Sequence, residues 1–321
     1  MERITIVASG PIGVSIGIGL KQIQLKDTEI VGTAGDRWIL VQGVKMGAFD
    51  STTGNLRSAM ANAGLVILDT AVNDTRKIME AIAPILEKDC VVTDTGPNKL
   101  PVLEWAEEYF GKDVNFVGGR PVLKEYPSSV DDASAAVFDD IEYCVVPARN
   151  AAAEAVRTVV GMIEVLGARP LFLDAAEHDS YSSAAVHMPR LLSSALVGSL
   201  SQSSAWREIA RLAGGEFKEV SQFAAENPED GAAAYLESPD TVSHWIDQAI
   251  AELISYRDHI KNGDDGLAAA LTRAYEERAK WVAGVIVEDK QPEVPTMGET
   301  MSGMFFGRRL SRKFKQMTDE S

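Results

Sequence analysis

The sequence predicts an α/β protein, with an N-terminal doubly wound domain of the Rossmann type followed by an all-α domain. Three observations lead to this fold class. The chain opens with a β-branched strand that passes through glycines into a helix, strand-like and helical segments then alternate to about residue 174, and from there the chain is almost wholly helical. We therefore expect a dinucleotide-binding domain at 1–174, a helical substrate and dimerisation domain at 175–288, and a basic tail at 289–321.

The first expected strand, Arg3–Val7, leads through two glycines into an apolar helical segment that ends near Leu25. Glycine lets the backbone approach a pyrophosphate, and a helix N-terminus supplies unpaired N–H groups and partial positive charge. Ala8 stands in the first of the three glycine positions of the usual pattern. The expected cofactor contacts are Ala8, Ser9, Gly10, Pro11, Ile12 and Gly13. The alternative is a tight strand-to-helix turn that binds no ligand.

The second expected strand, residues 29–33, bears on the choice between NAD and NADP. An acidic residue usually ends this strand in NAD-binding folds and binds the ribose hydroxyls. Here Ala34 and Gly35 follow the strand, and Asp36 and Arg37 come after them. The absence of a carboxylate at the strand tip, with Thr33 and Arg37 nearby, favours NADP, and we expect Asp36 and Arg37 among the cofactor contacts. In the alternative interpretation, Asp36 caps a helix from Arg37 onward and Arg37 is a solvated surface charge.

Five further strands and two helices complete the expected sheet domain. The strands are 65–68, 90–93, 114–117, 143–146 and 170–173, and the helices are 73–86, which Asn73 or Asp74 would cap, and 150–166. Ligands of parallel sheets lie beyond the carboxyl ends of the strands. We therefore expect residues 8–13, 70–72, 94–99 and 118–121 to surround one crevice, with Thr70 and Ala71 among the cofactor contacts.

The sequence after residue 174 predicts helices at 175–200, 201–212, 217–225, 240–260 and 267–287. Long apolar helices that carry Trp245 and Trp281 are typical of a dimer core, so we expect a homodimer. In the tail, methionines and phenylalanines precede a run of arginines and lysines. We expect the tail to fold back on its own body or its dimer mate; the alternative is a membrane surface.

Composition excludes several classes of function. The formal net charge of −16 over 321 residues argues against a general nucleic-acid binder, and no apolar run approaches the length of a membrane span. No Cys or His spacing suits a metal site. Cys90 and Cys144 lie in strand-like runs and are expected to be buried, reduced thiols. With a strand beginning almost at the first residue there is no room for a signal peptide, and we expect a cytoplasmic protein.

Several motifs in order resemble the prephenate dehydrogenase family, including its arogenate-using members. They are Thr93-Asp94-Thr95-Gly96, Phe116-Val117-Gly118-Gly119-Arg120-Pro121, Glu177-His178-Asp179, His187-Met188-Pro189-Arg190 and Gly214-Gly215-Glu216-Phe217-Lys218-Glu219. The resemblance covers roughly residues 3–286. It implies NAD(P)-dependent oxidative decarboxylation of a cyclohexadienyl acid, on the way to tyrosine.

The substitutions fall on groups that the resemblance places against substrate. Arg120 replaces the histidine of Gly-Gly-His-Pro, which bonds the substrate ring hydroxyl, and Pro97 replaces a serine beside it. Arg190 replaces the second histidine of His-Leu-Pro-His, while His187 keeps the first. Gln222 aligns with an arginine that clamps a substrate carboxylate. Arginine stays protonated near neutral pH, so it can pair with a carboxylate or stabilise an oxyanion but cannot act as a base.

We therefore expect His187 and Arg120 as catalytic groups, and Arg190, Asp94 and Gln222 as substrate contacts. A base, if one is needed, would be His187, or else Glu125 or Tyr126. Each residue has a structural alternative: His187 as a core histidine, His178 with Asp179 as orienting a helix start, Asp94 as a turn former and Glu125 as a surface carboxylate.

Three hypotheses remain open. The first is a dehydrogenase of prephenate, arogenate or a related cyclic acid. The second is a relative that oxidises another cyclic or hydroxy acid without decarboxylation. The third is a non-catalytic, cofactor-binding homodimer.

Overall fold

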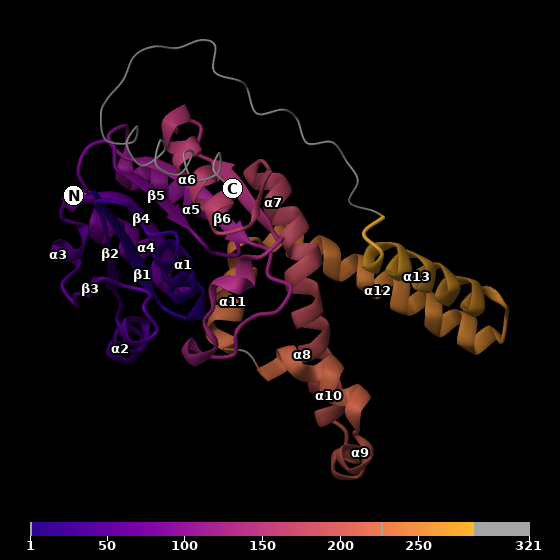
Figure 1. Ribbon diagram of the computed structural model, residues 1–321. Helices are drawn as coiled ribbons and strands as arrows, with labels where there is room; N and C mark the ends of the chain where they lie inside the picture. The colour runs from indigo at the N-terminus through magenta and orange to yellow at the C-terminus, as the bar shows by residue number, and fades with distance from the viewer. Residues whose placement is uncertain (1, 226, 286–321) are drawn as a thin grey trace.

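The computed structural model describes residues 2–225 and 227–285. The described residues form one eight-stranded sheet in the order β3-β2-β1-β4-β5-β6-β7-β8 (Figure 1). The strands are β1 Glu2–Ala8, β2 Thr28–Thr33, β3 Ser51–Thr52, β4 Ala63–Asp69, β5 Val91–Asp94, β6 Asn115–Pro121, β7 Glu142–Pro147 and β8 Arg169–Phe172. Neighbours pair in parallel except β6 with β7. The doubly wound, Rossmann-type fold is confirmed.

Helices cover both faces of this sheet, because its central strands are apolar on both faces. They are α1 Pro11–Gln22, α2 Arg37–Lys45, α3 Leu56–Met60, α4 Val72–Ile82, α5 Leu100–Phe110 and α6 Ala153–Val165, with 3₁₀ turns η1 Ala83–Ile85, η2 Val130–Asp132 and η3 Ala135–Phe138. In β4, Leu65 and Ile67 pack in one core with α1 and α6, and Val66 and Leu68 pack in a second core with α4 and α5. This two-residue period is that of a strand buried on both faces.

Two local expectations in the sheet domain were wrong. The strand expected to end at residue 117 continues as β6 through Pro121, where Arg120 pairs with Cys144 in the antiparallel ladder with β7. The glycines permit close packing, because a Cβ on Gly119 would lie 2.8 Å from the Asp94 carbonyl oxygen. Helix α4 begins at Val72 and has no side-chain cap, so neither Asn73 nor Asp74 caps it.

The helical half follows β8 directly. It comprises α7 Ala175–Ser182, the π-helical turn η4 Ser183–His187, α8 Met188–Ser201, α9 Trp206–Leu212, α10 Gly215–Ser221, η5 Gln222–Ala225, α11 Pro228–Glu237, α12 Pro239–Asn262 and α13 Gly266–Val282. Figure 1 shows α12 and α13 as a pair that projects away from the sheet, while α11 lies against the sheet domain. Sequence analysis missed α11, although Asn227, Pro228, Glu229 and Asp230 are a good helix start.

Among residues 2–225 and 227–285, no helix is both long and apolar enough to cross a membrane, and no cluster of three or more His, Cys, Asp or Glu residues is arranged to hold a metal ion. Cys90 and Cys144 are buried, free thiols, as expected, and burial raises the pKa of Cys90 to about 12. The basic tail at 289–321 lies outside the described residues.

Candidate active site

The glycine loop between β1 and α1 has the shape of a phosphate-binding turn. Gly10 is the N-cap of α1 in an extended conformation, and Pro11 takes the first helical position. Gly13 lies so close to the end of β4 that a Cβ there would be 2.8 Å from Asp69 Oδ2 and 3.1 Å from Ala8 Cβ. Only glycine fits at this contact, which is the helix-to-strand packing that the motif requires. The backbone of this loop therefore has a conformation that suits the pyrophosphate of a dinucleotide.

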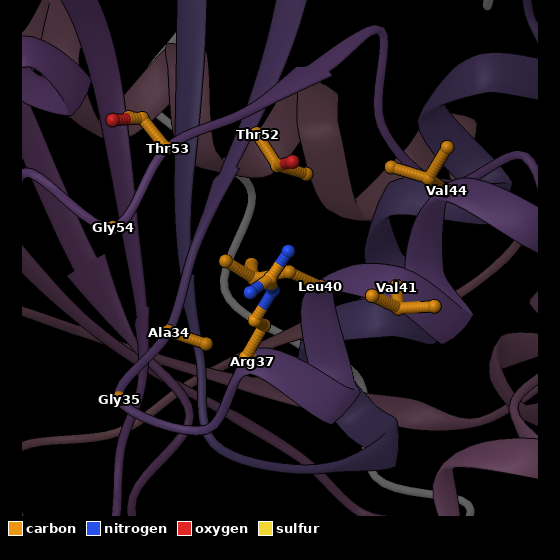
Figure 2. A pocket seen from close by; sticks show the side chains of 9 residues that line it. All are labelled: Ala34, Gly35, Arg37, Leu40, Val41, Val44, Thr52, Thr53 and Gly54. Carbon is orange, nitrogen blue, oxygen red and sulfur yellow. The ribbon is translucent and has the colours of Figure 1, made fainter.

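A first cavity of about 620 Å³ opens beyond the end of β2. In Figure 2 the Arg37 side chain extends from the start of α2 into the middle of this cavity, toward Thr52. The lining is Ala34, Gly35, Arg37, Leu40, Val41, Val44, Thr52, Thr53 and Gly54. It contains a cation and two hydroxyls but no carboxylate. Asp36 is not part of it, because its carboxylate accepts the Trp38 N–H at 2.8 Å and caps α2.

A second cavity of about 340 Å³ lies between the sheet edge and the helical half. It brings together five of the expected site residues, Ile12, Thr70, Ala71, Arg120 and Arg190, with the candidate base Tyr126. The other lining residues are Asp69, Val72, Thr95, Gly96, Pro97, Pro121, Asn227, Asp230, Gly231, Ala234 and Tyr235. The wall from α11 and the carboxylate of Asp69 were not found by sequence reasoning. Glu125, His187, Asp94 and Gln222 do not line this cavity.

Arg120 is held firmly at the cavity wall. It is 6% exposed, and its Nη1 donates to the Pro97 carbonyl oxygen at 2.9 Å and to the Ser182 hydroxyl. The Ser182 hydroxyl donates to the same carbonyl oxygen at 3.0 Å. Helix α7 and the loop after β5 thus orient the guanidinium, which keeps further N–H donors for an acidic ligand.

Asp94 lies beneath the cavity in a buried ion pair. Its Oδ2 accepts from Lys99 Nζ at 2.6 Å and from the Gly96 N–H at 3.0 Å, while Oδ1 accepts the Gly119 N–H at 3.0 Å. Lys99 is completely buried and also donates to the Gly96 carbonyl oxygen at 2.9 Å. These contacts support the turn-forming role that we weighed against a substrate contact.

His178 and Asp179 join the two halves of the chain. The Asp179 carboxylate accepts the N–H groups of Lys99 at 2.6 Å and Leu100 at 2.9 Å, and His178 Nδ1 lies 2.8 Å from Asp179 Oδ1. The pair therefore orients a helix start, but that of α5, since Asp174 caps their own helix α7. Burial lowers the pKa of His178.

His187 ends the π-helical turn and is completely buried. Its Nε2 is 3.1 Å from Asn98 Oδ1, and its ring meets the ring of Tyr235 edge-on with centroids 5.3 Å apart. Asn98 Nδ2 donates to the Ala234 carbonyl oxygen and Glu237, so the amide oxygen faces His187 and places the proton on Nε2. Burial, with Arg120 and Arg190 nearby, lowers the pKa of His187 to about 4.

His187 is therefore a neutral imidazole near pH 7, and no hydrogen-bond partner of its buried Nδ1 lies among residues 2–225 and 227–285. It stands behind the cavity wall that Tyr235 forms. Gln222 does not line the cavity and is exposed in the η5 turn. A substrate contact from Gln222 stays a prediction that this arrangement does not favour.

The comparisons with known proteins agree with this architecture. The model of the prephenate dehydrogenase nucleotide-binding domain matches residues 19–171, and that of the prephenate dehydrogenase dimerization domain matches residues 174–273. Prephenate dehydrogenase of Bacillus subtilis is 24% identical over 265 residues, which cover 82% of this chain and 71% of the relative. Cyclohexadienyl dehydrogenase of Zymomonas mobilis is 25% identical over 217 residues, covering 67% and 74%.

Solved structures show the same fold. Prephenate dehydrogenase from Aquifex aeolicus, in complex with hydroxyphenyl propionate and NAD+, has a TM-score of 0.81 at 23% identity and covers 87% of this chain and 98% of its own. Synechocystis arogenate dehydrogenase has a TM-score of 0.72 at 21% identity, covering 87% and 99%. The two domain models together span most of the chain in the order that the sheet and the helices take. The chain therefore belongs to the prephenate and arogenate dehydrogenase family of NAD(P)-dependent oxidoreductases.

Proposed function

We propose that this enzyme oxidises a cyclohexadienyl diacid, prephenate or arogenate, with loss of carbon dioxide. The observation that carries the proposal is the second cavity, where Arg120 and Arg190 lie beside Ile12 of the glycine loop. Two guanidinium groups suit a substrate with two carboxylates, because each can bind a carboxylate in two-point fashion. The apolar and aromatic remainder of the lining suits a six-membered ring.

In this proposal, the arginines bind the acidic groups of the substrate, and His187 or Tyr126 accepts a hydrogen bond. The nicotinamide, when bound, accepts the hydride from the ring carbon that carries the hydroxyl. Arg120, fixed by Ser182 and the Pro97 carbonyl, positions the acid and stabilises negative charge on oxygen, but it accepts no proton. Arg190 holds the other acidic group. Of the expected bases, His187 is neutral near pH 7 and has an unprotonated Nδ1, but it stands behind Tyr235, whereas Tyr126 lines the cavity itself.

For the cofactor we favour NADP over NAD. The first cavity presents Arg37, Thr52 and Thr53, and its lining carries no carboxylate that would repel a 2′-phosphate. An arginine near this ribose is the usual partner of a 2′-phosphate. Asp36, the nearest acid in sequence, is committed to capping α2.

We also propose a homodimer formed through the helical half. Helices α12 and α13 project from the body and expose large apolar side chains, including Leu253 at 58%, Leu271 at 53% and Trp281 at 65%. Exposed apolar surface of this kind is typical of a partner interface.

A second candidate is oxidation of another cyclic acid without decarboxylation. It is favoured by Arg120 and Pro97, which the resemblance places where the family has a histidine and a serine against the ring hydroxyl. The purified protein would be titrated with NADPH and NADH and then given prephenate and arogenate. Binding with turnover of either acid supports the first proposal. Binding without turnover of either refutes the first and leaves the second, and no dinucleotide binding refutes both.

A further inference from the structure

Asp69, at the end of β4, occupies the helix end where the cofactor is expected. Its Oδ2 accepts the Gly13 N–H at 2.9 Å, its Oδ1 accepts from the Thr95 hydroxyl at 3.0 Å, and its carbonyl oxygen accepts the Ser9 N–H at 2.7 Å. The side chain is 7% exposed, and the residue lines the second cavity. The Asp69 carboxylate is thus in direct contact with the backbone of the glycine loop.

The loop has few N–H donors to share. Pro11 has none, and the N–H groups of Gly13, Gly10 and Ser9 already interact with Asp69, which leaves Ile12 as the donor of the first turn. An anion bound at this helix end by Ile12 and Gly13 would bring its oxygens against Asp69 Oδ2. Two negative charges in contact at a shared donor repel each other, and the group that can take up a proton does so.

Charged and titratable groups surround Asp69. Tyr143 of β7 interacts with both Asp69 and Asp94 of β5. The residues that line the second cavity together with Asp69 include Arg120 of β6, Tyr126, Arg190 of α8, and Asp230 and Tyr235 of α11. Burial raises the pKa of Asp69, while hydrogen bonds from the Gly13 N–H, the Thr95 hydroxyl and the N–H groups of Gly10 and Ser9 oppose that rise. The carboxyl is therefore easier to protonate than an exposed aspartate, and a protonated carboxyl can donate a hydrogen bond where the carboxylate would repel.

We propose that Asp69 is a cofactor-positioning residue, and that the dinucleotide pyrophosphate binds together with a proton taken up by the Asp69 carboxyl. This inference rests on the proposed cofactor site. The bound anion raises the Asp69 pKa further, so uptake occurs between the pKa of the free protein and the higher pKa of the complex. Within that window the Kd for dinucleotide rises with pH, by up to about tenfold per pH unit.

The test is calorimetric titration of the full-length protein with NADPH and with NADH, from pH 5 to pH 9. Each titration is repeated in two buffers of different ionisation enthalpy, which gives the number of protons taken up per cofactor. Asp69→Asn keeps the size of the side chain, an acceptor for Gly13 and a partner for Thr95, but it cannot be charged. Asp74→Asn is the matched control, because Asp74 is an exposed acid five residues along in α4.

We expect the unmodified protein and Asp74→Asn to take up close to one proton within the window. Asp69→Asn should take up none beyond what the cofactor phosphates contribute, and it should bind about tenfold more tightly than the unmodified protein at pH 9. Equal proton uptake in Asp69→Asn and the unmodified protein, or binding weakened equally at every pH, overturns the inference and leaves the proposed function intact. No binding by any of the three proteins overturns the proposed function as well.

Discussion

The buried ion pair between Asp94 and Lys99 holds the floor of the second cavity, and its energetic role can be predicted. Among residues 2–225 and 227–285, Lys99 is the only side-chain cation bonded to Asp94, so Lys99→Met leaves a carboxylate that is 1% exposed with two backbone N–H donors. Breaking a buried pair from one side costs about 3–5 kcal/mol, because the remaining charge is uncompensated. We expect a loss of that size in the free energy of unfolding. Asp94→Asn, which strands the Lys99 ammonium, should cost a similar amount.

The double variant Asp94→Asn/Lys99→Met isolates the interaction. It carries no stranded charge, so it should lose clearly less stability than the two single variants added together. Guanidinium chloride unfolding followed by circular dichroism measures all three. Lys77→Met is the matched control: Lys77 is 76% exposed and 3.5 Å from Asp74, and an exposed pair of this kind contributes at most about 1 kcal/mol. A loss below about 1 kcal/mol for Lys99→Met, or strict additivity in the double variant, would refute this reasoning.

Three other residues and the dimer give further predictions. Arg37→Gln should weaken NADPH binding about tenfold or more and leave NADH binding unchanged in direct titrations, since only NADPH carries the 2′-phosphate; equal loss for both would contradict the assignment. Arg190→Gln should lower kcat/KM for the acid about 10- to 100-fold without changing the Kd for NADPH, because a charged hydrogen bond to a carboxylate is lost. Folding lowers the His187 pKa from 6.5 to about 4, so the folded protein binds fewer protons, and stability should fall by up to about 3 kcal/mol as the pH drops from about 6.5 to 4. His187→Gln should lack this part of the pH dependence of the free energy of unfolding measured in urea, and an unchanged pH profile would contradict the lowered pKa of His187. Leu253→Glu should shift the sedimentation coefficient from dimer to monomer, whereas an unaltered dimer would exclude this face.

The sheet domain was predictable because its signals are local. Strand β4 alternates between two cores, and a glycine turn between a strand and a helix has a distinctive pattern. Local signals also misled: the Gly-Gly-Arg-Pro segment suggests a loop, yet it is the end of β6, because the missing Cβ of Gly119 allows contact with Asp94. The antiparallel direction of β7 is set by tertiary packing and has no local sequence pattern.

The site was only partly predictable, because much of it is assembled from segments far apart in the chain. Arg120 and Arg190 were found through family motifs and do meet in one cavity. The hydrogen bonds of Asp179 to the start of α5 and of Asn98 to His187 span about 80 to 90 residues, and no sequence period encodes them. The Asp69 contact with Gly13 likewise depends on strand register, which places Ala8 of β1 beside Asp69 of β4.

The most direct test of the proposed reaction is a stoichiometry. Prephenate and, separately, arogenate would be incubated with the enzyme and NADP, and the reduced cofactor and the released carbon dioxide would be measured in the same vessel. We expect equal amounts of the two products with at least one of the acids, and loss of both together in Arg190→Gln. Reduced cofactor without carbon dioxide, or neither product from either acid, would contradict oxidative decarboxylation at this site.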